Sequence, residues 1–318
     1  MITVAGTVIA DFFARTLAGE PPRGFLTVID EIGFHLGGAA PNTGAVLARL
    51  NVPVSLVGRI GNDPLGILVR QQIEKWADKV SLACDPDCQT TAVIGHIFSD
   101  GNRSFIYAPG ASARFDTPDL NLEEEKAHGS KALHLGYAYL LPKLDGPPML
   151  EVLRRARKLG FLTSLDVSYH SGPDWKKLRE LLPFVDVFCP NSQEAEAITG
   201  ESKPEAAAEV LLENGVRQFV AIKSGERGAY ARPAKGEGNF YAAHDIEVVD
   251  STGAGDAYIA GVLAAWHRGL DWYEAARIAN AAGALAVTKQ GAAEGLESWE
   301  QAMDLLKRQN RNWILRIP

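Results

Sequence analysis

The sequence predicts an α/β fold, a doubly wound and mainly parallel sheet flanked by helices. Strand-length apolar runs alternate with amphipathic helical segments through most of the chain, an order typical of parallel sheets covered on both faces. The length of 318 residues suffices for one large α/β domain or two small ones. The hydrophobic fraction of 46% and the charged fraction of 22% are ordinary for a globular protein.

Individual elements follow from local patterns. Apolar runs bounded by turn residues predict buried strands at 2–10, 54–60, 132–135, 162–166, 185–189 and 218–223. Helical periodicity predicts helices at 41–50, 64–77, 149–159, 193–199, 204–214, 255–268, 273–288 and 299–307. Some helix starts are well marked, because Asp63 and Pro64 supply an N-cap followed by proline, and Ser298 with Gln301 forms a capping box.

Two stretches break the alternation and predict a small β-sheet lid. Residues 25–36 and 91–107 are extended without an intervening helix, and the run 99–102, SDGN, is a strong signal for a hairpin turn. We therefore expect a single domain over residues 1–318, with a lid formed by about 12–36 and 91–108. The alternative is that these stretches are edge strands of the main sheet.

Composition and charge argue against several classes of function. The formal charge is −7, from 32 basic and 39 acidic residues, and no Lys/Arg block occurs, so we expect neither nucleic acid nor a membrane surface as partner. No apolar run approaches the roughly 20 residues of a membrane span. The three cysteines, Cys84, Cys88 and Cys189, do not suggest a disulfide framework or a complete zinc site, and they fit a reducing cytoplasm.

The most informative stretch is 250–256, DSTGAGD, which follows a strand-like run at 246–249 and opens an apolar helix. Gly253, Ala254 and Gly255 let a ligand approach backbone N–H groups. The helix N-terminus adds positive potential, so the site suits a phosphate or another developing anion. Asp256, in the first helical turn, is placed to accept a proton from an attacking hydroxyl. Together these features indicate phosphoryl transfer to an alcohol.

The same stretch has plainer interpretations. Aspartate is favoured in the first turn of any helix, and glycine-rich turns between strand and helix are common in α/β proteins. The stretch is not a P-loop, because no Gly-Lys-Ser/Thr follows it. It is not a dinucleotide fingerprint either, because Tyr258 holds the place of the third glycine.

Two motifs resemble the signatures of the PfkB/ribokinase family of carbohydrate kinases. Residues 250–261, DSTGAGDAYIAG, resemble the C-terminal signature, and residues 37–42, GGAAPN, are similar to the N-terminal one, which closes at Gly61. Gly44 replaces a usual Ala or Ser, and Asn51 replaces a usual Gly at a turn where Asn also tolerates the αL backbone. The resemblance covers roughly residues 1–300, with the motifs in the expected order and spacing.

The resemblance implies a ribokinase-like fold with a small β-lid, ATP as the phosphoryl donor, Mg²⁺, and often a bound monovalent cation such as K⁺. It implies that Asp256 is the catalytic base. It also implies that the amides of Gly253, Ala254 and Gly255 hold the transferring phosphoryl oxygens, with positioning and charge stabilisation supplying most of the catalysis.

A sugar site is implied by the same resemblance. Asp11, which we expect at the end of the first strand, would bind two substrate hydroxyls; otherwise it is an N-cap or an exposed loop carboxylate. Gly37 and Gly38 would let the backbone approach the substrate. Asn42 would bind a sugar hydroxyl, unless it caps the helix behind Pro41.

Two further residues are candidates for substrate contact. Arg103 alternates with Phe105 and Tyr107 along one lid strand, so the three side chains would share one side, either over the substrate or packing the lid itself. Asp166 ends a predicted strand and is a candidate for contact with substrate or metal.

A nucleotide site is implied by motifs that follow two later strands. Asn191 and Glu194 form a capping box that also resembles the family's Asn-x-x-Glu motif near ATP phosphates and magnesium, with Glu194 acting through metal-bound water. The run 223–228, KSGERG, resembles the family's nucleotide wall. In that wall Lys223 would pair with ATP phosphates, unless it is a solvated lysine at a strand end.

The remaining candidates lie around the nucleotide and a cation. Gly225 and Gly228 belong to the nucleotide wall, and Asn280 lies on the helix that borders the adenine in the family, unless it simply faces solvent. Asp250 and Thr252 are candidates for the monovalent cation, because carboxylate and carbonyl oxygens suit hard cations.

The sequence therefore predicts an ATP-dependent phosphotransferase that phosphorylates a hydroxymethyl group of a sugar or sugar acid. A nucleoside kinase of the same family is the alternative, since Phe12, Phe13 and Phe105 could stack on a base. The Tyr-x-Arg arrangement associated with ketodeoxygluconate kinases is absent at 107–109, YAP. A non-catalytic sugar- or nucleotide-binding protein and a nicotinamide dehydrogenase are rivals from other classes. Edge strands in the lid suggest a homodimer through the lid.

Overall fold

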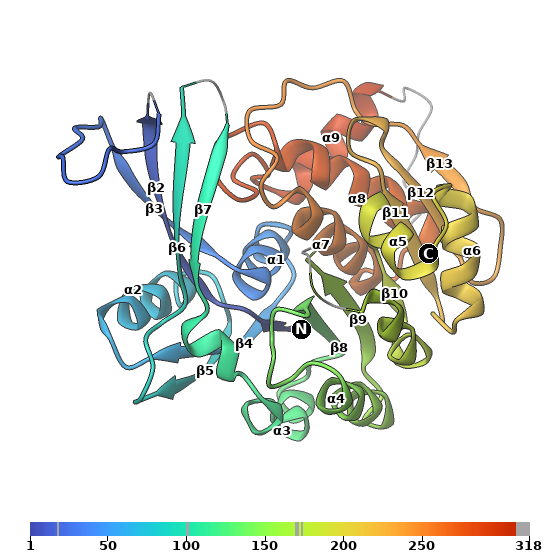
Figure 1. Ribbon diagram of the computed structural model, residues 1–318. Coiled ribbons are helices and arrows are strands. Elements are labelled where there is room, and N and C mark those ends of the chain that lie inside the picture. Colours follow the sequence, from blue (N-terminus) through green and yellow to red (C-terminus); the bar gives the residue numbers. More distant parts are fainter. Residues whose placement is uncertain (18, 100–101, 169–171, 173, 310–318) are drawn as a thin grey trace.

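The structure is a computed structural model that describes residues 1–17, 19–99, 102–168, 172 and 174–309. Its larger sheet contains, in spatial order, β13 (Asn239–Tyr241), β12 (Ala229–Pro233), β11 (Phe219–Lys223), β10 (Val187–Phe188), β9 (Leu162–Val167), β8 (Ala132–Ala138), β1 (Ile2–Gly6), β4 (Val54–Gly61) and β5 (Lys79–Asp85) (Figure 1). The strands from β5 to β11 pair in parallel, and β12 and β13 add an antiparallel edge.

The chain winds in both directions from β1, as the sequence predicts. It first moves outward through β4 to β5, then returns to β8 and continues through β9 and β10 to β11. In such sheets ligands bind beyond the carboxyl ends of the strands, near the point where the winding reverses. Here that point lies between β1 and β8.

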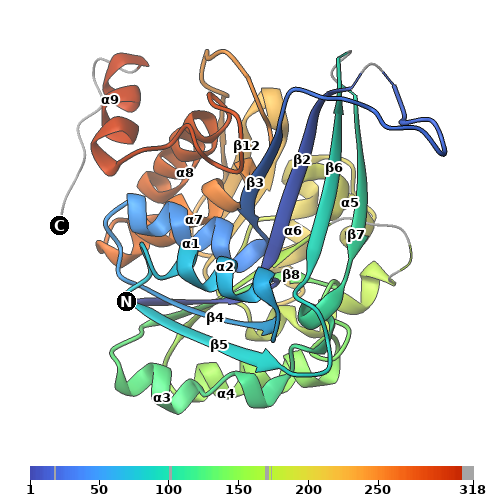
Figure 2. The same ribbon diagram turned by 90° about the vertical axis from the view of Figure 1, so that its left-hand side faces the viewer.

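Helices cover both faces of this sheet and enclose two apolar cores (Figure 2). One face carries α1 (Ala39–Arg49), α2 (Pro64–Ile73), α7 (Ala254–His267), α8 (Trp272–Ala286) and α9 (Trp299–Gln309). The other face carries α3 (Leu122–Ala127), α4 (Pro147–Lys158), α5 (Ser192–Thr199) and α6 (Pro204–Glu213). Short 3₁₀ turns lie at Gly110–Arg114, Thr117–Asp119, Trp175–Glu180, Leu182–Phe184 and Gly225–Arg227. Among the described residues, no helix combines the length and apolarity needed to cross a bilayer.

The smaller sheet has the order β3 (Ile32–Gly37), β2 (Ile9–Leu17), β6 (Ala92–Phe98) and β7 (Arg103–Ala108). It stands beside the main sheet as a separate layer (Figure 1), so these strands are not edge strands of that sheet. Strands β6 and β7 pair antiparallel, while part of the hairpin turn predicted between them, 100–101, lies outside the described residues.

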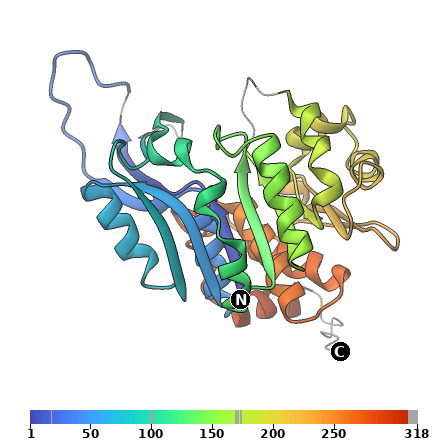
Figure 3. The ribbon, with the colours of Figure 1, turned by 90° about the horizontal axis from the view of Figure 1, so that it is seen from below.

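The expected extended segment 25–36 is only partly a strand. Strand β3 begins at Ile32, and residues 25–31 form a loop that projects from the body in Figure 3. Phe25, Leu26 and Val28 are more than three-quarters exposed there, so the apolar pattern that suggested a strand has no described partner to bury it.

The expected strand 2–10 is divided between the two sheets, which corrects one prediction. Strand β1 ends at Gly6, where a Cβ would overlap the carbonyl of Gly136, and β2 begins at Ile9 in the lid. Between them Thr7 is fixed to the start of α1, because its Oγ1 accepts a hydrogen bond from the N–H of Ala39 at 3.0 Å. The sequence does not reveal this break, because residues 2–10 form one continuous run. All of them are buried, in the main sheet and in the lid alike.

Several short elements carried no usable sequence signal. Strands β12 and β13 are short antiparallel additions at one edge, β5 is a partly exposed strand at the other, and α3 is an acidic six-residue helix. Asn51, by contrast, follows its prediction, because it adopts a φ of 55° in the left-handed region at the end of α1.

Candidate active site

The stretch 250–256 forms a loop that opens α7 at the carboxyl edge of the main sheet. Gly253 is the N-cap residue and has a φ of 76°, and no side chain caps the helix there. A Cβ on Gly253 would approach the backbone of Ala293 at 3.0 Å. No side chain therefore accepts from the first amides of α7, although the N–H of Ala254 lies 3.3 Å from the Ser251 carbonyl oxygen. An uncapped helix start suits an anion. We call residues 250–255 the anion loop.

Asp256 lies directly behind this loop and is held by donors from two other elements. Its Oδ2 accepts hydrogen bonds from Asn42 Nδ2 of α1 at 3.0 Å and from the Tyr137 hydroxyl of β8 at 2.9 Å. Thr43 Oγ1 lies 3.5 Å from Oδ1. The carboxyl is almost completely buried, with 3% of the residue exposed. Its position is therefore fixed from three directions.

Burial makes Asp256 an unusual carboxyl group. Removal from water, together with the nearby charge of Asp166, raises the pKa of Asp256 to about 7, although the hydrogen bonds from Asn42 and Tyr137 and the charge of Lys223 act in the opposite direction. A carboxyl with a pKa near neutrality can take up and release a proton at physiological pH, as a general base requires.

Tyr137 is a site residue that the sequence did not reveal. The β8 strand is irregular between Leu135 and Ala138, and Tyr137 has a φ of 59°, which an L-residue with a large side chain rarely adopts. Such irregularities are frequent beside active sites because they redirect a side chain. Here the irregularity accompanies the hydrogen bond from Tyr137 to Asp256, and no residue-type pattern marks it.

Lys223 and Asp166 form a buried ion pair beside the anion loop. Lys223 Nζ lies 3.7 Å from Asp166 Oδ1, and a Cβ on Gly255 would lie 3.0 Å from the ammonium group. Burial alone would lower the pKa of Lys223, but nearby carboxylates, including Asp166, Glu194 and Asp256, outweigh it and raise that pKa. Lys223 is therefore a largely buried, paired cation beside the start of α7, and not a solvated strand-end lysine.

Asp11 lies in the lid sheet, not at the end of the first strand as expected. Its carboxyl faces Gly37, where any Cβ would overlap it, and Gly38 has a φ of 94° against the backbone of Thr7. The Oδ1 atom of Asp11 is buried without a hydrogen-bond partner, and burial raises the pKa of Asp11 to about 7. Asp11, Gly37 and Gly38 thus come together as predicted, although on a different strand.

Asn42 does not cap a helix. Helix α1 begins at Ala39 with Gly38 as its N-cap, so Asn42 lies inside the first turn and its side chain is directed to Asp256. The alternative of a cap behind Pro41 is therefore wrong. Asn42 connects the N-terminal signature to the C-terminal one through a single hydrogen bond.

Arg103 extends from the lid to the anion loop. Its guanidinium donates to Asp250 Oδ1 at 3.1 Å and to Thr252 Oγ1 at 3.2 Å. Asp250 also accepts from the backbone N–H groups of Thr252 and Gly291. Burial alone would raise the pKa of Asp250, but these donors and the charge of Arg103 lower it. The side chain of Asp250 is thus surrounded by donors, and it does not fit a monovalent cation while Arg103 stays in place.

The predicted nucleotide residues form two groups. Asn191 and Glu194 make the predicted capping box at the start of α5, with hydrogen bonds of 2.9 and 2.8 Å, and Asn191 forms a parallel bridge with Lys223. The second group surrounds the segment 241–243: a Cβ on Gly228 would overlap the Tyr241 carbonyl, and Asn280 Nδ2 donates to the Ala242 carbonyl at 2.7 Å.

Gly225 and the lid aromatics face open space. Gly225 has a φ of 57°, and a Cβ there would meet no atom within 4 Å. Phe105 and Tyr107 are 58% and 39% exposed, so they do not close-pack the lid. Among the described residues, no group of three or more His, Cys, Asp or Glu side chains gathers as a ready metal site.

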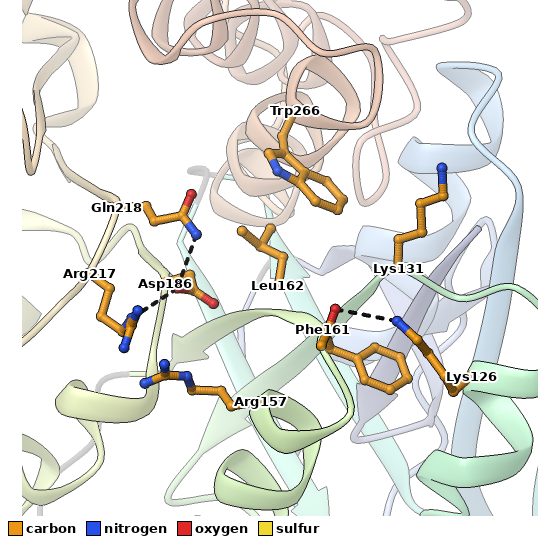
Figure 4. A pocket seen from close by; sticks show the side chains of 10 residues that line it. Lys126, Lys131, Arg157, Phe161, Leu162, Asp186, Arg217, Gln218 and Trp266 are labelled. Carbon is orange, nitrogen blue, oxygen red and sulfur yellow. Dashed lines mark hydrogen bonds and ion pairs between the residues drawn. The ribbon is translucent and has the colours of Figure 1, made fainter.

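One hollow borders this arrangement and a second lies away from it. One, of about 650 Å³, reaches Asn42 from the outer side of α1 and is lined also by Leu36, Arg49 and Trp76. The other, of about 580 Å³, lies at the amino ends of β8 to β11, and Figure 4 shows its basic side chains Lys126, Lys131, Arg157 and Arg217 together with Asp186. None of the predicted site residues lines this second hollow, so the candidate active site occupies the opposite edge of the sheet.

Comparison with known proteins agrees with this geometry. Residues 1–299 match the family described as pfkB family carbohydrate kinase. The chain is 29% identical over 315 residues to 2-dehydro-3-deoxygluconokinase of Bacillus subtilis, covering 96% of this chain and 94% of that protein. It is 30% identical over 275 residues to aminoimidazole riboside kinase of Salmonella typhimurium, covering 82% and 84%. The structure of Arabidopsis thaliana ribokinase complexed with ribose and ATP superimposes with a TM-score of 0.82, at 24% identity and with 96% and 98% coverage.

The doubly wound sheet with a separate lid is a ribokinase-like fold. The family match and the curated relatives place the chain among sugar and nucleoside kinases. The chain belongs to the PfkB family of carbohydrate kinases.

Replacement of Asp256 by Asn should stabilise the fold increasingly as the pH rises. Because the native pKa of about 7 exceeds the ordinary aspartate value of 3.8, the contribution of Asp256 to stability is full below pH 3.8 and is lost as the pH rises through 7. The variant cannot ionise there, so urea titrations should show an advantage in unfolding free energy of about 2–4 kcal/mol at pH 8 and about 1 kcal/mol or less at pH 4.5. The exposed control Asp304→Asn should show no such trend, and an Asp256→Asn advantage independent of pH would contradict the buried carboxyl.

Proposed function

We propose that this protein transfers the terminal phosphoryl group of ATP to a hydroxymethyl group of a sugar or sugar acid, with Asp256 as general base. The observation that carries the proposal is the buried Asp256 carboxyl, fixed by Asn42 and Tyr137 directly behind an uncapped helix start. In this arrangement Asp256 accepts the proton of the acceptor hydroxyl. The amides of Gly253, Ala254 and Gly255, together with Lys223, stabilise the charge on the phosphoryl oxygens.

The acceptor binds between the lid and α1. Asp11 accepts hydrogen bonds from two hydroxyls through a carboxyl that has an unsatisfied buried oxygen, and its raised pKa falls when those donors arrive. Gly37 and Gly38 keep the backbone clear for the substrate. The Nδ2 group of Asn42 holds Asp256, which leaves its amide oxygen for a hydroxyl.

ATP binds along the edge from Lys223 to α8. The segment 241–243, which Gly228 and Asn280 contact, lies beside the adenine base of ATP. Gly225 leaves open space at the entrance to this nucleotide site. Magnesium, bound through water near the buried Glu194, would neutralise phosphate charge, and an oxygen ligand of this kind suits that ion. The K⁺ proposed at Asp250 and Thr252 requires oxygens other than the Asp250 carboxylate, because that group is engaged by Arg103.

A nucleoside acceptor is the second candidate. Phe105 is 58% exposed on the face of the lid that carries Arg103, where it could stack on a base. A relative that is 30% identical is an aminoimidazole riboside kinase. The non-catalytic and dehydrogenase alternatives have no comparable support, because they assign no task to Asp256.

Location and assembly complete the proposal. The free state of Cys84, Cys88 and Cys189 fits a cytoplasmic protein. The outer face of the lid exposes Ile94 and Ile106, which are direct cross-strand partners on β6 and β7. Exposed apolar patches on a sheet commonly mark an interface, so we propose a homodimer through this face.

ADP release in the presence of Mg-ATP tests the proposed reaction. We expect stimulation by one member of a panel of fructose, ribose, ketodeoxygluconate, adenosine and inosine, with and without K⁺. Asp256→Asn should lower kcat at least about 100-fold, because proton removal is lost, while calorimetry shows ATP still binding. Turnover unchanged in Asp256→Asn would sink the mechanism, and stimulation by nucleosides alone would favour the second candidate.

Tyr137→Phe should move the acid limb of the kcat/KM profile to higher pH. The hydroxyl of Tyr137 lowers the pKa of Asp256, so its removal raises that pKa, by about one unit, and less base is present at pH 7. Tyr139→Phe is the matched control, because Tyr139 also has a positive φ but its hydroxyl contacts Asp174 instead. Equal pH profiles for the two variants would show that Tyr137 does not tune Asp256.

Ile106→Glu should convert the proposed dimer to a monomer, since it places a charge in the centre of the outer lid face. Sedimentation velocity measures the change. Phe240→Glu, at an exposed apolar position on β13, is the control and should leave the dimer intact. A wild type that sediments as a monomer, or a dimer that survives Ile106→Glu, would contradict the interface.

A further inference from the structure

The lid carries the positive charge of Arg15 on the same face as Asp11. Cross-strand pairing places Asp11 opposite His35 and Val93, and Val93 opposite Tyr107, so these side chains share one face of the sheet. By alternation along β7, Arg103 lies on that same face, where it contacts the anion loop. The face that carries Asp11 is therefore the one turned toward Asp256.

Arg15 belongs to this face through its contacts. Its guanidinium lies 5.8 Å from the ring centroid of Phe13 and its NH2 atom is 3.5 Å from His35 Nε2. His35 in turn packs edge-on against Phe13. The Arg15 side chain thus extends back along β2 toward Asp11 and covers Phe13. Phe13 is two residues from Asp11, which is about 7 Å along an extended strand.

Among the described residues, no carboxylate forms an ion pair with Arg15, although the charges of Arg15 and Glu31 both act on His35. Among the described residues its guanidinium has only the long contact to His35 as a hydrogen-bond partner, and its NH1 atom is buried with none. The neighbouring Arg103 differs, because Asp250 accepts from it. The chain has a net charge of −7, so acidic residues are plentiful, and a part-buried arginine that pairs with none of them is costly to the fold.

Two unsatisfied groups of opposite kind therefore lie on the same face of the lid. Asp11 has a buried carboxyl oxygen that lacks donors, and Arg15 has a buried N–H group that lacks an acceptor. A neutral polyol can satisfy Asp11, but it leaves the guanidinium without a counter-charge. A hydroxy acid satisfies both, because its hydroxyls donate to Asp11 and its carboxylate accepts from Arg15 in a charge-assisted hydrogen bond.

We propose that Arg15 binds the carboxylate of the acceptor, so that the protein prefers a sugar acid to neutral sugars and nucleosides. The inference rests on the proposed function, since it assigns the substrate class of that site. It gives Arg15 a role in specificity at the end of the acceptor remote from Asp256.

Direct binding tests this subsite without requiring turnover. Calorimetry on the Asp256→Asn protein would compare ketodeoxygluconate and gluconate with glucitol, the neutral counterpart of gluconate. We expect at least one acid to bind at least about tenfold more tightly than glucitol, and Arg15→Gln to raise the Kd of that acid at least about tenfold while the Kd of glucitol is unchanged. Arg15→Lys, which keeps the charge, should retain part of the preference.

Arg23→Gln is the matched control, because it makes the same change at an exposed arginine in the loop between β2 and β3. Its binding should equal that of the parent, and the melting temperatures of the Gln variants should agree. In the Asp256-containing enzyme, Arg15→Gln should raise KM for the acid and leave kcat nearly unchanged, as expected for a group remote from the reacting hydroxyl.

The outcomes separate this inference from the proposed reaction. Equal affinity for acids and glucitol, or an acid Kd unaffected by Arg15→Gln, overturns the carboxylate subsite. ADP release with a neutral sugar or a nucleoside but with no acid also overturns it, while the kinase mechanism stands. Acid binding that depends on Arg15, without ADP release from any acceptor, keeps the subsite and contradicts the proposed reaction.

Discussion

The burial of the Asp256 carboxyl at the start of α7 is the constraint on which the rest of the site depends. A carboxylate removed from water is costly unless donors replace the water, and Asn42 and Tyr137 supply them from α1 and β8. Those two elements lie on either side of the point where the winding of the sheet reverses. The topology thus brings the N-terminal motif, the irregularity in β8 and the anion loop to one carboxyl group.

The charges around Asp256 form a balanced set. Lys223 lies beside the start of α7 and is paired with Asp166, so each of these two charges has a counter-charge. Asp166 raises the pKa of Asp256 while Lys223 lowers it. The lid contributes a second set of groups, and the contact of Arg103 with Asp250 joins the tip of the lid to the anion loop.

Much of this arrangement could be predicted from the sequence, because its parts are local. The alternation of strands and helices, the capping box at Asn191 and Glu194 and the left-handed turn at Asn51 depend on neighbouring residues alone. The division of the run 2–10 between two sheets could not be predicted from neighbouring residues, because the run is buried in both sheets. The hydrogen bond of Tyr137 depends on the irregularity in β8, and the role proposed for Arg15 depends on the surroundings of its guanidinium. Only the folded chain reveals either.

The protonation of Asp256 is the most direct test of this account. A ¹³C-NMR titration of aspartate-labelled protein follows each carboxyl, and comparison with the Asp256→Asn protein identifies the resonance of Asp256. The account predicts a transition near pH 7, because burial raises the pKa of this carboxyl to about 7. A transition near pH 4, as for an exposed aspartate, would contradict the claim that a buried, donor-held carboxyl lies at the centre of the site.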